Sequence, residues 1–186
     1  MTAAVTETFV PGYEATTWNI DPVHSEVGFS VRHMMVSKVR GRFTGFSGQI
    51  VTAEDPAQSS VTAEIDLASI NTGNEQRDAH IKSADFFEVE TYPTMTYKST
   101  GVRVEDGEYI LDGDLTLKGV TKNVPLRLEL NGFGPDPFGG VRAGFTATGE
   151  INRRDFNVNF NAPMANGGAV VADKIALHLE IEAVKA

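Results

Sequence analysis

The stretch KIALHLEIE, residues 174–182, decides the fold class of this chain. Every second residue from Ile175 to Ile181 is large and apolar, and the residues between them include His178 and Glu180. Successive side chains of a β-strand point to opposite faces, so this period of two predicts a strand with one buried and one wet face. The chain is therefore expected to end in an amphipathic strand of an antiparallel sheet.

The same alternation recurs along most of the preceding chain. Its apolar positions are Val27, Phe29 and Val31; Val61, Ala63, Ile65 and Leu67; Tyr109, Leu111, Leu115 and Leu117; Val124, Leu126, Leu128 and Leu130; and Val141, Ala143, Phe145 and Ala147. A phase slip at Gly45 predicts a β-bulge or a sharp coil of the strand there. A shorter run is expected at residues 156–160, ending near Pro163.

One segment lacks the apolar alternation of the strands and predicts a short helix. Residues 75–83 contain good helix formers without a cluster of β-branched side chains, and Asn74 or Thr72 precedes them as a cap. Phe86 and Phe87 follow in a loop, and their aromatic rings are expected to insert into the core as a plug.

Many strands linked by hairpins, with one apolar phase and a single helix, predict an all-β fold. An antiparallel sheet closed on itself is favoured, because closure removes exposed edges, and a two-sheet sandwich is the alternative. About eight strands enclose an interior that is either filled by side chains or able to hold one small ligand. The alternation does not choose between a filled and a hollow barrel.

Length and composition limit the function. A chain of 186 residues fits one domain, expected at 18–186, after a flexible N-terminal tail at 1–17. The tail has no early Lys or Arg and no apolar run, so no secretory signal is expected and a cytoplasmic location is favoured. A net charge of −9 argues against nucleic acid and against anionic membrane surfaces as partners, and the absence of cysteine excludes thiol chemistry. No stable membrane insertion is expected.

Three separated motifs resemble the YceI-like, polyisoprenoid-binding family, and the resemblance runs from about Trp18 to Val184. The motifs are Trp18, Ile20, Asp21, His24 and Ser25; Arg77, Asp78, His80, Ser83, Asp85, Phe86 and Phe87; and Leu115, Leu117, Gly119, Val120 and Thr121. The resemblance implies an extended, lipocalin-like antiparallel β-barrel whose apolar pore takes the tail of an isoprenoid or similar lipid, often in a homodimer. The chain departs from the family at Asn157, where a glycine is usual, although Asn tolerates positive φ better than most residues.

On this resemblance the ligand is a polyisoprenoid, an isoprenoid quinone or a similar long-chain lipid, with no other cofactor. The candidate residues of the pore wall are Phe29, Val31, His33, Phe43, Ile65, Met95, Tyr97, Leu115, Leu128, Phe145 and Phe160. The candidates for a phosphate or other polar head group are Arg32, Arg40, Arg42 and Arg77, because Arg binds phosphate oxygens through paired donors. The alternatives are a filled core for the wall residues and a solvated outer face for the arginines.

Catalysis and metal binding are not predicted. The histidines show no ligand pair at helical spacing, and the spacing of His24, Asp21 and Ser25 matches no nucleophile motif. We expect His24 to hold the first turn and His80 to pin the helix to the barrel. A non-enzymatic lipid carrier is therefore the main hypothesis. A lipid-modifying enzyme, for which His33 is the best candidate, and a filled barrel acting in protein interaction are the alternatives.

Overall fold

The computed structural model describes residues 10–34, 36–162 and 170–186. Its strands are β1 (Thr17–Ile20), β2 (Glu26–His33), β3 (Ser37–Phe43), β4 (Phe46–Val51), β5 (Ser60–Asp66), β6 (Ile70–Asn71), β7 (Thr94–Glu105), β8 (Glu108–Leu117), β9 (Val120–Asn123), β10 (Leu126–Pro135), β11 (Val141–Asn152) and β12 (Val171–Lys185). The helix α1 is Glu75–Lys82, and three short 3-10 helices are η1 (Pro56–Gln58), η2 (Leu67–Ser69) and η3 (Arg153–Phe156).

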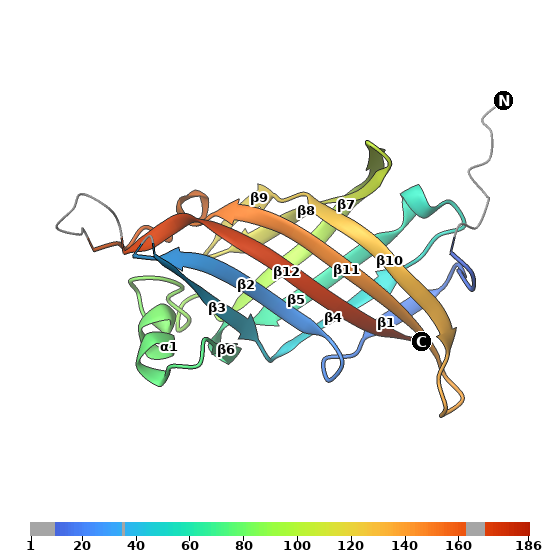
Figure 1. Ribbon diagram of the computed structural model, residues 1–186, viewed down its shortest axis with the longest axis horizontal. Helices are drawn as coiled ribbons and strands as arrows, with labels where there is room; N and C mark the ends of the chain where they lie inside the picture. Colours follow the sequence, from blue (N-terminus) through green and yellow to red (C-terminus); the bar gives the residue numbers. More distant parts are fainter. Residues whose placement is uncertain (1–9, 35, 163–169) are drawn as a thin grey trace.

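The strands close into an elongated antiparallel barrel (Figure 1). Eight of them form the ring in the order β1-β4-β5-β7-β8-β10-β11-β12, and β12 closes it by pairing with β1, with Trp18 opposite Lys185. This confirms the predicted closed barrel of about eight strands. The long strand β12 also pairs with β2, which carries β3 and β6 as a branch beside α1.

The phase slip at Gly45 is a break between two strands rather than a bulge or a coil within one. β3 ends at Phe43 and pairs with β2, whereas β4 begins at Phe46 and pairs with β1 and β5. At this break the carbonyl of Gly45 accepts a hydrogen bond from the N–H of Asp66, at the end of β5, at 2.8 Å. The chain therefore changes neighbours at the point where the alternation changes phase.

The short strand expected at residues 156–160 is not formed. Residues 153–156 form η3 instead, and Asn157 ends it in the left-handed conformation with φ 59°. That conformation interrupts the extended backbone that a strand needs, and it shows why Asn can stand where the family usually has glycine. The predicted end of this run near Pro163 lies outside the described residues.

The predicted short helix is present and covers one end of the barrel. Asn74 caps α1, because its side chain accepts a hydrogen bond from the N–H of Arg77 at 2.9 Å. In Figure 1 the helix lies beside β3 and β6, at the end where β2 and β3 meet. Among the described residues, no helix combines the length and apolar character needed to cross a membrane.

The barrel's contacts begin before the predicted boundary at residue 18. The hydroxyl of Tyr13 donates to the carbonyl of Ala53 at 2.6 Å, and Thr52 donates to the carbonyl of Glu14. Trp18 is fully buried, and its indole N–H donates to Thr52 Oγ1 at 2.9 Å. Residues 1–9 of the predicted tail lie outside the described residues.

Candidate functional site

A cavity of about 440 Å³ occupies the interior of the barrel. Well-packed cores contain few voids larger than a water molecule, whereas ligand pockets occupy about 300–1,000 Å³. The cavity-lining residues of β12 extend from Val171 to Ile181, which corresponds to roughly 30 Å of strand. The barrel is thus hollow along much of its length, a point that the sequence left open.

The cavity wall contains every residue predicted for it. Phe29, Val31, His33, Phe43, Ile65, Met95, Tyr97, Leu115, Leu128, Phe145 and Phe160 all line the cavity. Phe160 is 37% exposed and lies at one end, with its ring centroid 4.9 Å from that of His80 and 5.4 Å from that of Phe86. Phe86 and Phe87, the predicted plug, also line the cavity at the side covered by α1. Contact of these side chains with a ligand stays a prediction.

Two glycines let aromatic rings lie against the wall of the barrel. A Cβ atom at Gly41 would overlap the ring of Phe29, and one at Gly113 would overlap the ring of Tyr97. The Tyr97 hydroxyl donates to the carbonyl of Val124 at 2.9 Å, and burial raises the pKa of Tyr97 far above its usual value. The ring is therefore fixed against the sheet as a neutral phenol, and space is left along the axis.

The four head-group candidates differ in whether they contribute to the cavity lining. Arg77 is partly buried and lines the cavity, and Arg32 also contributes to the lining although it is exposed and lies on the outward phase of β2. Arg40 and Arg42 are exposed and do not line the cavity. Part of Arg77 is already engaged, because its Nε and Nη2 donate to the hydroxyl and carbonyl oxygens of Thr72 at 2.8 and 2.7 Å. The structure therefore places only Arg32 and Arg77 where they could meet a ligand in the cavity.

A buried cation that was not predicted from the sequence also lines the cavity. The side chain of Arg153 is 4% exposed, lines the cavity and donates to four backbone carbonyls, those of Val158 (2.8 Å), Phe160 (2.7 Å), Val171 (3.3 Å) and Ala172 (3.0 Å). Burial lowers the pKa of Arg153 below its usual value. Because Arg153 lies outside any alternating run, no periodic signal in the sequence marks it as buried.

Basic side chains gather at one end of the cavity. His33 on β2 lies opposite Val171 on β12. Arg153 donates hydrogen bonds to the carbonyls of Val171 and Phe160. The ring of Phe160 in turn contacts the ring of His80. Arg32 and Arg77 lie next to this group on β2 and α1. Among the described cavity-lining residues there is no Asp or Glu. The end of the cavity next to α1 therefore favours a negatively charged or polar group.

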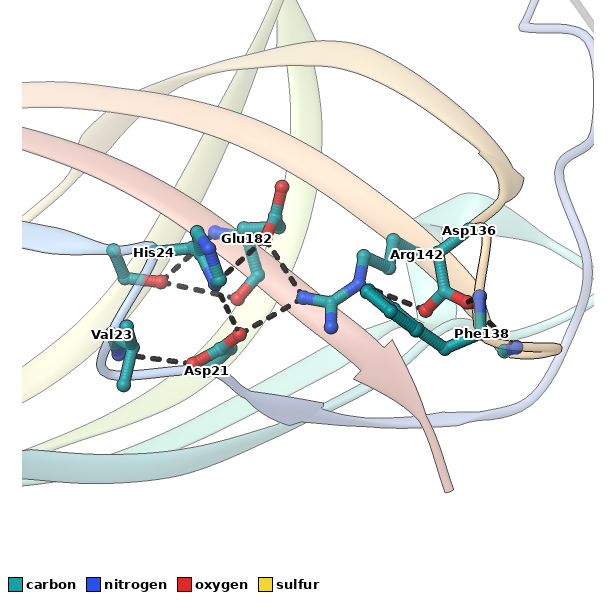
Figure 2. Close-up of polar contacts among 9 residues, drawn as sticks. Asp21, Val23, His24, Asp136, Phe138, Arg142 and Glu182 are labelled. Atoms are coloured by element: carbon teal, nitrogen blue, oxygen red, sulfur yellow. Dashed lines mark hydrogen bonds and ion pairs between the residues drawn. The ribbon is translucent and has the colours of Figure 1, made fainter.

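A second polar cluster joins two loops on the outer surface (Figure 2). Arg142 Nη1 donates to Asp21 Oδ2 and Glu182 Oε2, each at 2.9 Å, and its Nε donates to Asp136 Oδ2 at 3.0 Å. His24 Nδ1 lies 2.7 Å from Asp21 Oδ2, so His24 holds the first turn as predicted. Asp21, His24 and Glu182 could also ligate a cation, with their ligand atoms within 4.8 Å of one another. In this structure the Arg142 guanidinium supplies the positive charge that binds both carboxylates.

This cluster predicts an acid-dependent contribution to stability. Hydrogen bonds from His24 and Arg142 lower the pKa of Asp21 to about 2, whereas an unfolded chain protonates Asp near pH 3.9. The contribution, about 1 kcal/mol for a partly exposed network, is therefore complete above about pH 4 and is lost as the pH falls towards 2. Asp21→Asn should lower the urea midpoint at pH 7 and remove part of its decrease between pH 4 and 2. An unchanged acid profile in the variant would contradict this assignment.

The fold and the site define a class of protein, a closed antiparallel barrel of lipocalin-like form with an apolar internal cavity and one basic end. The chain belongs to the YceI-like family, because the family model, described as a YceI-like domain, matches residues 18–183. Protein YceI of Escherichia coli O157:H7 is 43% identical over 136 residues, which cover 73% of this chain and 71% of the relative.

Solved structures share the architecture. The crystal structure of the Campylobacter jejuni YCEI protein superposes with a TM-score of 0.70 at 32% identity, covering 89% of this chain and 96% of that one. A polyisoprenoid binding domain from Saccharophagus degradans gives a TM-score of 0.66 at 16% identity, covering 93% of this chain and 100% of the domain, and at that identity it supports the fold alone.

Proposed function

We propose that the barrel binds the apolar chain of one long lipid, a polyisoprenoid, an isoprenoid quinone or a similar molecule, and acts as a non-enzymatic carrier or store. The observation that carries this proposal is the long cavity of about 440 Å³ lined by apolar side chains. It is supported by membership of the YceI-like family and by the fold shared with a domain described as polyisoprenoid binding. A filled barrel acting in protein interaction is not favoured by an interior of this size.

Burial of the chain supplies enough free energy for useful affinity. About ten methylene groups at roughly 0.8 kcal/mol each contribute about 8 kcal/mol before the costs of association and ordering. The hydrophobic effect has no direction, so this term does not distinguish an isoprenoid chain from an acyl chain. Selectivity must come from the shape of the cavity and from its ends.

We further propose that the lipid lies with its head group at the end next to α1. That end contains Arg32, His33, Arg77 and His80, whereas Tyr13, Ser59 and Tyr109 line other parts of the cavity and are neutral. Arg32→Gln combined with Arg77→Gln should weaken binding of a prenyl phosphate about tenfold, because charge-assisted hydrogen bonds to phosphate are lost. Binding of the matching prenyl alcohol should change little.

The matched control for this prediction is Arg40→Gln combined with Arg42→Gln, which also removes two positive charges, both from the outer face of β3. Both sets of affinities can be measured by competition with a fluorescent prenyl probe. If the control variant weakens phosphate binding as much as Arg32→Gln with Arg77→Gln does, the effect reflects overall charge and the proposed orientation is wrong.

An enzyme acting on a lipid in the same cavity is the second candidate, and His33 is the residue on which it depends. His33 lies on the inward phase of β2 and lines the cavity. A carrier predicts that His33→Gln binds the same lipid species as the wild type. Accumulation of a chemically different lipid in the variant would favour the enzyme, whereas a loss of bound lipid would show that His33 contributes to binding.

The direct test of the proposal is solvent extraction of the freshly purified protein followed by mass spectrometry of the extract. A lipid with a long apolar chain, present in about equimolar amount, is the expected result, and its head group would be identified at the same time. An extract without lipid, also after incubation with prenyl and acyl lipids, would refute the proposal.

A further inference from the structure

The hairpin formed by β2 and β3 carries an unusual set of charges. Residues 27–53 contain no Asp or Glu, although the whole chain has 25 acidic residues and a net charge of −9. Within this segment lie Arg32, Lys38, Arg40 and Arg42, all exposed. The hairpin is therefore a local basic surface on an acidic protein.

These cations share one face of the sheet. Arg32 lies directly opposite Lys38, Arg40 lies opposite Ser30, and Arg42 lies opposite Gly28, so all of them alternate with the inward-facing side chains. Like charges directly opposite each other on a sheet destabilise it, and Arg32 and Lys38 form such a pair. An external anion bound to this face would compensate their repulsion.

Most of the other arginines differ from those of the hairpin. Arg77 donates to Thr72, and the other five each have a carboxylate within ion-pair distance: Arg103, Arg127, Arg142, Arg153 and Arg154. Within residues 10–34, 36–162 and 170–186, no such carboxylate is present for Arg32, Lys38, Arg40 or Arg42. The neighbouring helix α1 adds no net charge, since Glu75 and Asp78 balance Arg77 and Lys82. Carboxylates of the described residues therefore do not neutralise the positive charges of the hairpin, and these charges are available to bind an anionic partner.

The tip and the inner face of the hairpin indicate which partner. At the tip, Val36 is 80% exposed and Met34 is 41% exposed. On the inner face, Val31, His33 and Val39 line the cavity, and the hairpin meets α1 at the same end of the barrel (Figure 1). Cations beside exposed apolar side chains are typical of surfaces that lie on anionic lipid.

We propose that the β2–β3 hairpin docks the protein on an anionic membrane surface, with the basic end of the cavity close to the bilayer. The net charge of −9 does not prevent this, because charges are screened beyond about 8 Å at physiological ionic strength. The acidic remainder of the surface instead disfavours other orientations. This inference goes beyond lipid binding in the cavity, and docking can be measured whether or not the cavity is occupied.

The test is co-sedimentation of the full chain with phosphatidylcholine vesicles that contain or lack phosphatidylglycerol. Binding is expected only with phosphatidylglycerol and should decrease with salt. Each Lys or Arg near an anionic surface contributes about fivefold, so Arg40→Gln with Arg42→Gln should lower the partition constant about 30-fold. Lys98→Gln with Lys122→Gln removes two exposed charges from β7 and β9 and should leave binding nearly unchanged.

A second variant locates the docking surface. Trp18 is the only tryptophan and is fully buried, so an indole introduced by Val36→Trp gives a distinguishable signal. Its emission should shift to the blue on addition of phosphatidylglycerol vesicles. No binding, equal binding to both vesicle types, equal losses in the two double variants or vesicle binding without a blue shift would each overturn the proposal. Equally tight binding of duplex DNA at the same salt would also overturn it, because the surface would then be a general polyanion site.

Discussion

Arg153→Met is expected to lower the free energy of unfolding by about 3 kcal/mol or more, since each buried acceptor left unpaired costs about 1–3 kcal/mol. The wild-type side chain is 4% exposed and donates to the carbonyls of Val158, Phe160, Val171 and Ala172. Methionine fills much of the space but donates no hydrogen bond. The melting temperature should fall by about 6–12 °C for a chain of this size. Urea denaturation at neutral pH measures the effect.

The adjacent residue provides the control. Arg154 is 46% exposed, and its Nε donates to Asp173 at 2.7 Å. Exposed ion pairs contribute about 0–1 kcal/mol, so Arg154→Met should lower stability by less than 1 kcal/mol. Equal effects of the two variants would show that charge, and not the hydrogen bonds of Arg153 to backbone carbonyls, stabilises this end of the barrel.

Ala147→Phe is expected to weaken binding of a long apolar lipid roughly 50-fold, because about three methylene groups lose their place in the cavity at roughly 0.8 kcal/mol each. Ala147 lies on β11 between Leu128 and Leu179, and all three line the cavity. Because Ala147 lines the cavity, the added ring is directed into it, and thermal unfolding of the variant checks that the folded state is retained. Titration of delipidated protein with a fluorescent prenyl probe measures the affinity.

Thr148→Phe is the matched control, because the next residue of a strand points to the opposite face. Thr148 pairs with His178 and does not line the cavity. This variant should bind the probe as the wild type does. Similar losses in both variants would mean that the probe does not occupy the interior of the barrel.

The strand pattern predicted much of the fold and the inward direction of the proposed wall residues that lie on strands. A period of two assigns each residue to a face, so once Phe29, Leu115 and Leu128 are placed on the apolar phase their inward direction follows. The predicted helix differs from α1 only at its last residue, Ser83. These features depend on local spacing, which a single sequence contains.

Features that depend on tertiary contacts were not predictable in this way. Alternation places Phe43 and Phe46 on different phases but does not show that β3 and β4 pair with different strands. Arg153 is held in the interior by backbone carbonyls that lie 5 to 19 residues further along the chain. The hollow interior depends on how large side chains lie on the wall, as the Tyr97 ring does over Gly113, and no periodicity encodes that arrangement.

Native mass spectrometry shows whether the barrel interior holds one long apolar lipid. Delipidated protein would be titrated with a long-chain prenyl alcohol, with Ala147→Phe measured in parallel. We expect a one-to-one complex of the wild type that is strongly reduced in the variant. No complex with the wild type, or equal complex formation by both proteins, would refute lipid binding in the interior.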